Sequence, residues 1–294
     1  DALTTGNYNV ALGYAALSTE DGNGANVAVG KSALQNLNAG SDAFNVAVGY
    51  EAGGAVSTGT RNTIIGGLAG DALTTGHYNV ALGYAALSGE DTHSANTAIG
   101  YQALAAQNAG ADALNVAVGY HAGLNITTGT TNTIMGGEAG DALTTGSNNV
   151  AIGYQALGSE DAHGRNVAIG KSTLQAQNAG ADAYNIAIGY NAGYSVTTGT
   201  NSTIIGSLAG DAITTGYGNV AIGYYALSAE DTGGTNVAIG HAALQVQDAG
   251  ANAYNVAIGY DVGKAITTGT KNTIIGGDAG ITLTTGENNT ALGY

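Results

Sequence analysis

Cysteine, proline and tryptophan are absent from this chain of 294 residues, which has a single phenylalanine and a single methionine. Without cysteine there can be no disulfide and no thiolate metal site. The apolar residues are almost all alanine, valine, isoleucine, leucine and tyrosine, which excludes a core built from a mixture of large side chains. Such a narrow choice of apolar residues indicates a repetitive interior.

Basic residues are also scarce, because six lysines and arginines stand against 21 aspartates and glutamates, a net charge of -15. This excess repels phosphate backbones and anionic membrane surfaces, so we expect no nucleic-acid partner. No window approaches the roughly 18 apolar residues of a membrane-spanning helix, and the first residues lack a secretion signal. We therefore expect no membrane insertion by this segment. Because the chain begins without methionine and stops within a motif, we expect it to be part of something longer.

What the sequence has is repetition on two scales. The segment DALTTG at residue 1 returns at residue 71 and at residue 141, and returns as DAITTG at residue 211, which sets a long repeat of 70 residues. Inside it, the shorter motif N-[VTI]-[AI]-[VIL]-G begins every 17 or 19 residues and has 17 copies between Asn9 and Asn289, the last one truncated. Self-similarity at a fixed period predicts a solenoid. We expect one repetitive domain over residues 1–294, with long repeats 1–70, 71–140, 141–210 and 211–280, a partial repeat 281–294 and no separate domains.

Each position of the short motif has a strict residue preference. The first residue is asparagine in 16 copies and Ser202 in the other, the second is always β-branched, and the third is alanine in 13 copies and isoleucine in four. The fourth is always large and apolar, the fifth is always glycine, and alanine follows three residues later in 14 of the 16 complete copies. This pattern predicts a short strand that ends at a glycine corner. The frequent glycine and the lack of a 3.6-residue stripe argue against a helix.

The sequence therefore predicts an all-β chain, a parallel β-solenoid or β-roll with coils of 17–19 residues. Each coil is expected to contain a strand, a corner, a second short strand and a turn such as TTGT or NAGSDA, in which Gly and Asn supply positive φ. The asparagines are expected to bond to one another through their side-chain amides. We predict structural roles for thirteen residues: Asn9, Val10, Leu12, Gly13, Ala16, Asn45, Gly49, Ile64, Asn115, Ala117, Gly119, Ile188 and Gly189.

The apolar third position of the motif carries a prediction about partners. The second and fourth residues of a strand face one way and the third faces the other, so a strand that is apolar at all three is expected to be buried on both faces. We expect the alanine face, which includes Ala117 and Ala187, to pack against an identical chain.

Every fourth coil departs from this pattern at two positions. There the third residue is isoleucine, and the residue after the glycine is small, at Gly67, Gly137, Ser207 and Gly277. We interpret this as an exchange of volume between neighbouring layers. Ten copies have tyrosine after the glycine, and we expect these rings to pack over the sheet.

Titratable residues form few constellations. An acidic pair recurs in one loop of each long repeat, which predicts a solvated loop, with occasional Ca²⁺ binding as the alternative; the pairs are Glu20-Asp21, Glu90-Asp91, Glu160-Asp161 and Glu230-Asp231. The five histidines never recur at one repeat position, and no catalytic or phosphate-binding motif is present. We expect no catalytic residue, no cofactor and no metal site. An enzyme that cuts polysaccharide and an ice-binding solenoid with threonine-rich turns are less favoured, the latter because at most two adjacent turns carry threonine.

The segments NVALGYAAL, NVAVGKSAL, NTAIGYQAL and NVAIGHAAL resemble the N-x-A-[IV]-G-x-x-A repeats of the YadA-like head domain of trimeric autotransporter adhesins. Similar repeats occur in the shafts of some phage tail fibres. The resemblance covers essentially the whole chain. It implies a left-handed parallel β-roll, a homotrimer around one axis and a role in surface attachment. The coils here are longer than that family's usual coil, and its coiled-coil stalk and membrane anchor are missing from this chain.

These observations predict a structural fibre segment, extracellular, at a cell surface or on a virion, that serves as a rigid shaft for attachment. Its expected partners are further copies of itself and a host-surface or cell-surface receptor. A second hypothesis is an end-to-end homopolymer that forms a surface or matrix filament, because both termini break off within the repeat without a polar capping coil.

Overall fold

The computed structural model describes residues 6–20, 22, 24–89, 92–160 and 162–294. These residues contain 17 strands of three residues and no helix, in two compact units, Asp1–Asn148 and Asn149–Tyr294. The strands of the first unit are β1 (Val10–Leu12), β2 (Val27–Val29), β3 (Val46–Val48), β4 (Thr63–Ile65), β5 (Val80–Leu82), β6 (Thr97–Ile99), β7 (Val116–Val118) and β8 (Thr133–Met135). Those of the second are β9 (Val150–Ile152), β10 (Val167–Ile169), β11 (Ile186–Ile188), β12 (Thr203–Ile205), β13 (Val220–Ile222), β14 (Val237–Ile239), β15 (Val256–Ile258), β16 (Thr273–Ile275) and β17 (Thr290–Leu292). No helix long and apolar enough to cross a membrane occurs in the part of the chain that the structure describes.

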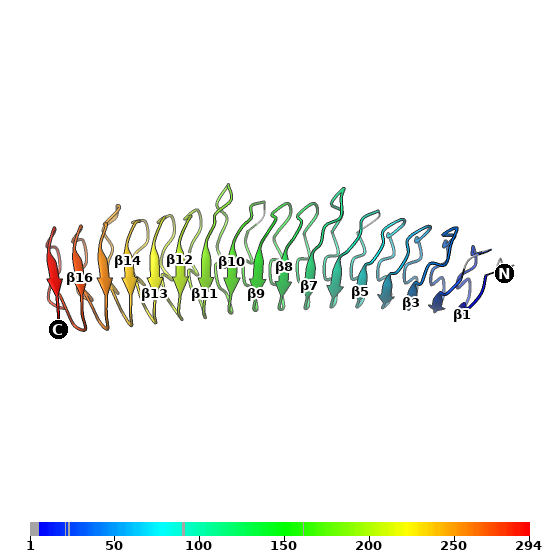
Figure 1. The fold of residues 1–294 in the computed structure, drawn as a ribbon, viewed down its shortest axis with the longest axis horizontal. Helices are drawn as coiled ribbons and strands as arrows, with labels where there is room; N and C mark the ends of the chain where they lie inside the picture. Colours follow the sequence, from blue (N-terminus) through cyan, green and yellow to red (C-terminus); the bar gives the residue numbers. More distant parts are fainter. Residues whose placement is uncertain (1–5, 21, 23, 90–91, 161) are drawn as a thin grey trace. The chain divides into compact units, whose positions relative to one another are not determined.

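Within each unit, every strand pairs in parallel with the next strand along the chain (Figure 1). Identical motif positions lie opposite one another, so that Ala117 of β7 lies between Ala98 of β6 and Ile134 of β8. A parallel neighbour can be reached only by a connection that returns to the same end of the strand, and here that connection is the rest of the coil. Each unit is thus a parallel β-solenoid, and the predicted all-β fold class is confirmed.

An asparagine ladder joins the coils where the strands begin. The Oδ1 atom of Asn115 accepts a hydrogen bond from the backbone N–H of Asn132 at 2.8 Å, and its Nδ2 donates to the carbonyl of Gly129 at 2.7 Å. Where Ser202 replaces asparagine, its Oγ accepts from the N–H of Asn219 at 3.2 Å. The predicted ladder therefore exists, but it mainly joins each side chain to the backbone of the next coil. Amide-to-amide bonds of the expected kind also occur near the end of the chain, Asn272 to Asn255 at 3.2 Å and Asn289 to Asn272 at 3.0 Å.

The glycine after each strand forms the predicted corner. Gly119 has a φ of 142°, in a region that residues with a side chain rarely adopt. A Cβ atom at Gly119 would lie 2.5 Å from the carbonyl oxygen of Gly136 in the next coil. Glycine is required here twice over, for its backbone conformation and for the close approach of successive coils.

The second strand that we expected beyond the corner is not formed. The residues that follow the glycine make a run of turns, in which Ala15 and Leu17 have φ values of 56° and 52°. A left-handed residue at every second position is incompatible with an extended strand. The return arm of the coil is therefore made of turns that hydrogen-bond to neighbouring coils, as where the N–H of Leu34 donates to the carbonyl of Ala52 at 3.1 Å.

The prediction that glycine supplies positive φ in the turns is right for one kind of turn and wrong for the other. Gly110, in an NAG turn, has a φ of 73°. At a TTGT turn the left-handed residue is instead Thr131, directly after the turn, with a φ of 60°. Gly129 of that turn is needed for space, because a Cβ atom there would collide with the carbonyl oxygen of Gly146.

The two faces of the strands have the opposite roles to those expected. Ala117 and Ala187 are 0% exposed within the single chain, because the third motif position lines the interior of its own coil. The prediction that the alanine face packs against another chain is therefore wrong. The second and fourth positions face outward, and Val116, the neighbour of Ala117, is 37% exposed. Alanine is used inside because the interior is closely packed and has no room for larger side chains there.

The exchange of volume that we inferred takes place inside one chain. Ile64 reaches toward Gly53 and Gly70, where an added Cβ atom would lie 2.8 Å and 3.5 Å from Ile64 Cδ1. In the second coil the interior position equivalent to these glycines is filled by Leu34, which is completely buried. The isoleucine of every fourth coil thus fills space that the glycines leave. The small residue after the corner in the same coil is not explained by this exchange.

Candidate functional site

Four columns of side chains make up the outward surface of the strands, which we call the outer band. They are the residue before the ladder asparagine, the second and fourth motif residues, and the residue after the corner glycine. In the fifth coil these are Tyr78, Val80, Leu82 and Tyr84, alternating with Asn79 and Ala81, which are buried. The alternation of Val80, Ala81 and Leu82 follows from the extended backbone of β5, which points alternate side chains to opposite faces, and Tyr78 and Tyr84 lie just outside the strand.

The outer band collects the exposed large apolar side chains. In the first unit all fourteen such residues among those described belong to it, and in the second unit eleven of fifteen do. Except for Tyr14 and Tyr294 in the terminal coils, the tyrosines after the corner are about half exposed, for example Tyr120 at 52%. That these rings pack over the sheet stays a prediction. Three of them, Tyr84, Tyr101 and Tyr120, stack on one another, with ring centroids 5.5 Å apart. Stacking leaves the ring edges open to solvent and the ring faces covered.

Charge is segregated between the outer band and the rest of the chain. All 21 aspartates and glutamates lie outside the four columns, whereas five of the six basic residues lie in them: Lys31, Arg61, Arg165, Lys171 and Lys271. Four of these cations lie over an aromatic ring of the next coil, as Lys31 does over Tyr50 at 5.0 Å and Arg61 over Tyr78 at 5.4 Å. The band is thus apolar and weakly basic on a strongly acidic chain.

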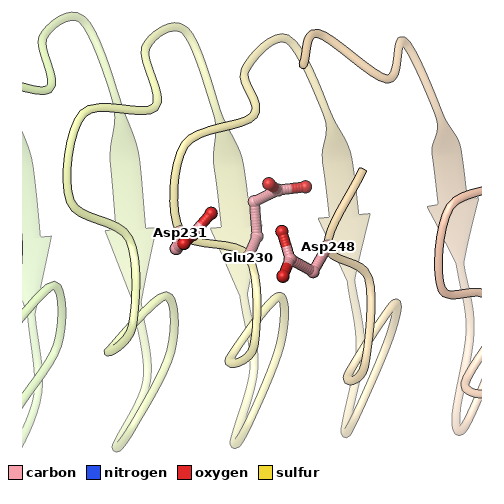
Figure 2. Close-up of side chains that lie close together, drawn as sticks. All are labelled: Glu230, Asp231 and Asp248. Carbon is pink, nitrogen blue, oxygen red and sulfur yellow. The ribbon is translucent and has the colours of Figure 1, made fainter. Parts of the chain in front are cut away.

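A second candidate site is a cluster of three carboxyl groups. Figure 2 shows Glu230 and Asp231 on one coil and Asp248 on the next, and one oxygen from each lies within 4.8 Å of the others. Glu230 is completely buried, and its Oε1 accepts a hydrogen bond from the N–H of Gly233 at 2.7 Å. Carboxylate oxygens are the ligands that hard cations prefer, so this is the arrangement among the described residues that could hold such an ion.

Burial and like charge govern the titration of this cluster. Burial raises the pKa of Glu230 from 4.5 to about 7, and the charges of Asp248 and Asp231 add to the rise, while the Gly233 hydrogen bond opposes it. Desolvation and the charge of Asp231 also raise the pKa of Asp248. A carboxyl group with a pKa near 7 has the acidity of a general acid or base. Since Glu230 is 0% exposed, a substrate could not contact it in this conformation.

The prediction of a solvated acidic loop is wrong for its described glutamates, whereas Asp231 is partly exposed. Glu20, Glu160 and Glu230 are all 0% exposed, each turned into the coil. Asp21, Glu90, Asp91 and Asp161 lie outside the described residues. Among the histidines, His241 Nδ1 lies 3.0 Å from Asp261, and His77 Nδ1 accepts from the N–H of Thr60 at 3.0 Å.

The thirteen residues with predicted structural roles fall into four groups. The ladder residues Asn45 and Asn115 are buried, and Asn9, at the first coil, is partly exposed. Interior positions are Ala16, Ile64 and Ala117, and outward positions are Val10, Leu12 and Ile188. The corners are Gly13, Gly49, Gly119 and Gly189, all with φ between 137° and 145°.

Two features were missed by the sequence reasoning. The outer band was overlooked because the third motif position was taken as the outward one. The available signal was that all five band cations lie directly before the motif asparagine or directly after the motif glycine, which marks these positions as exposed. Asp248 was overlooked because the other long repeats have Asn38, Asn108 and Asn178 at its position. Its distance of 17 residues from Asp231, one coil, was the available signal.

A cavity of about 230 Å³ lies against the first coil, lined by Gly13, Tyr14, Ala15, Ala16 and Ser18. None of these side chains is a carboxylate, imidazole or amine. Its walls therefore offer neither a metal site nor an acid-base pair.

Comparison with protein-family models, with curated proteins and with solved structures finds no match for this chain.

Proposed function

We propose that this chain is a structural segment of a fibre or filament, exposed outside the cell or on a virion, that acts as a rigid shaft for surface attachment. The observation that supports the proposal most strongly is the regular repetition of the connections between coils within each unit. In each unit every strand pairs with the next, and the ladder asparagine of one coil bonds to the backbone of the following one, at 2.8 Å between Asn115 and Asn132. A stack in which each coil is fixed to its neighbour in the same way is suited to carrying load rather than to changing shape.

The proposed partners are further copies of the chain and a receptor on a host or cell surface. The resemblance to YadA-like heads and tail-fibre shafts favours a homotrimer. The exposed apolar surface of the strands supports association, because contiguous exposed apolar patches of more than a few hundred Å² are rare on monomers. We propose no catalytic role, since the carboxyl group with the most strongly raised pKa, Glu230, is closed to substrates.

Native mass measurement together with electron microscopy of the same sample tests the proposal. We expect a closed homotrimer in the mass measurement and straight, uniform rods in the images. Open filaments of increasing mass would favour the alternative, an end-to-end homopolymer in a surface or matrix filament. A monodisperse single chain at micromolar concentration would contradict self-association in either form.

A further inference from the structure

We propose that the outer band is the surface on which a second copy of this chain packs side by side, and that the small residue of every fourth coil sets the axial register of the two copies. This inference rests on the proposed function, because it assumes that the chains associate, and it names the surface and its register. The corner column of the band reads Tyr14, Lys31, Tyr50, Gly67 in the first long repeat. The later repeats vary the second residue and always end on Gly or Ser.

The area of the band is large enough for a specific interface. A tyrosine side chain carries 150–250 Å² of surface, so the five tyrosines after the corners of the first unit, each 45–79% exposed, offer roughly 500 Å² by themselves. The strand positions and the tyrosines before the ladder asparagines add to this. The sum approaches the roughly 800 Å² that each partner contributes to a standard protein interface.

The composition of the band is also that of a protein interface. Interface centres are rich in aromatic residues and arginine and poor in aspartate and glutamate. The band has aromatic residues in two of its columns and contains none of the 21 acidic residues. Some acidic residues lie beside it: Glu51 follows Tyr50 in the chain, and the Asp182 carboxylate lies 2.8 Å from the Arg165 guanidinium. An apolar centre with a charged margin favours a protein partner over an anionic polymer, which would require more than five scattered cations.

The gaps in the corner column identify the partner as a second copy. Gly67 and Gly277 do not have a left-handed φ, and a Cβ atom at either would meet a tyrosine ring at ordinary contact distances, 3.6 Å and 3.9 Å. The chain's own packing therefore does not require glycine there, and Ser207 shows that a side chain is accepted. The gaps recur every four coils within each unit, from Gly67 to Gly137 and from Ser207 to Gly277. A second copy of this chain has the same four-coil period, so its surface can stay in step with the gaps along each unit.

Charge placed on the band tests the surface. We expect Tyr120→Glu with Tyr190→Glu to weaken association by about 100-fold or more, because each carboxylate would be buried in the interface without a partner. The matched control is Thr128→Glu with Thr198→Glu, at exposed turn positions that are also 70 residues apart. Light scattering gives the assembly state, and circular dichroism shows whether the separated chains remain folded. Dissociation of the band variant alone would support the surface.

Filling the gaps tests the register. We expect Gly67→Tyr, Gly137→Tyr, Ser207→Tyr and Gly277→Tyr, made together, to dissociate the assembly while the chain stays folded. The control is Lys31→Tyr with Lys171→Tyr, which adds tyrosine to the same column outside the gaps. Tyr101 occupies the equivalent position in the second long repeat, so tyrosine is accepted there. Equal association of gap-filled and control variants would overturn the register. If the natural chain associates and the band variants associate equally well, the surface is wrong although the proposed function stands; a natural chain that is monomeric would overturn both.

Discussion

The inward and outward sides of the same strands have different tasks, although both are apolar. On the inward side, alanine or isoleucine is completely buried in 15 of the 17 strands, and the choice between them follows the space left by glycines such as Gly53. On the outward side, the residues are larger and partly exposed, and they vary between β-branched, aliphatic and aromatic types. The comparison shows that side-chain volume limits the interior, whereas the outer side accepts larger residues of several types but no aspartate or glutamate.

The largest effect should come from placing the same charge on the two sides of one strand. Ala117→Glu would bury a carboxylate among Ala98 and Ile134, with neither space nor a partner, at a cost of several kcal/mol in the free energy of unfolding. Val116→Glu projects into solvent in the single chain and should leave the fold intact. Circular dichroism and thermal melting of the two variants would measure the difference. Melting temperatures that are equal, or reversed in order, would contradict the assignment of the faces.

The corner glycine, which closes the strand between the two sides, should have the next effect. Gly119→Val would force a branched side chain into a φ of 142° and against the carbonyl of Gly136, at a cost of about 3 kcal/mol or more. Thr128→Val, in an exposed turn, should change the free energy of unfolding by less than about 0.5 kcal/mol. Denaturant melts of both variants provide the comparison. A Gly119 variant as stable as the turn variant would show that the corner tolerates side chains.

The asparagine ladder should show a graded effect. Asn115→Ala removes the side chain that accepts a hydrogen bond from the N–H of Asn132 and donates to the oxygens of Gly129 and Gln107, each at 2.7–2.8 Å. We expect this loss to lower the free energy of unfolding by about 2 to 4 kcal/mol. Asn115→Ser should cost less, because its Oγ can accept from Asn132 as Ser202 accepts from Asn219. Hydrogen exchange at the Asn132 amide would report the bond directly. Equal protection of the Asn132 amide against exchange in the alanine and serine variants would show that the side-chain acceptor at position 115 does not stabilise the fold.

The sequence was sufficient for the parts of the fold that depend on local rules. Gly119 and its equivalents marked the corners, and the β-branched residues between Asn and Gly marked the strands, because glycine and β-branched residues have strong backbone preferences. The faces were assigned wrongly because Ala and Val are both apolar, and only the closed coil decides which of them has room inside. The second strand was wrong because left-handed Ala15 and Leu17 have no sequence signal of their own.

The candidate sites depended on contacts between coils, which explains why they were only partly foreseen. The outer band follows from the phase of the strand, so a one-residue error in phase exchanges its members for the interior ones. Asp248 joins Glu230 only through the stacking of one coil on the next. The ring stacking of Tyr101 on Tyr120 likewise depends on the distance between coils, which residue types alone do not specify.

The smallest effect should come from Glu230, whose carboxyl group is buried inside the coil. Since the pKa of Glu230 is raised from 4.5 to about 7, its carboxyl is protonated in both folded and unfolded chains below pH 4.5 and then has no cost. Between pH 4.5 and 7 the unfolded chain ionises first, so stability falls as pH rises, and above pH 7 the loss is complete at about 1 to 3 kcal/mol. Glu230→Gln should therefore be more stable than the natural chain at pH 8 and no more stable at pH 4, as measured by denaturant melts. Asp248→Asn, which restores the residue of the other long repeats, should reproduce part of this gain by removing a repulsive charge. If calcium instead raised the melting temperature of the natural chain but not of Asp248→Asn, the three carboxyl groups would form a cation site.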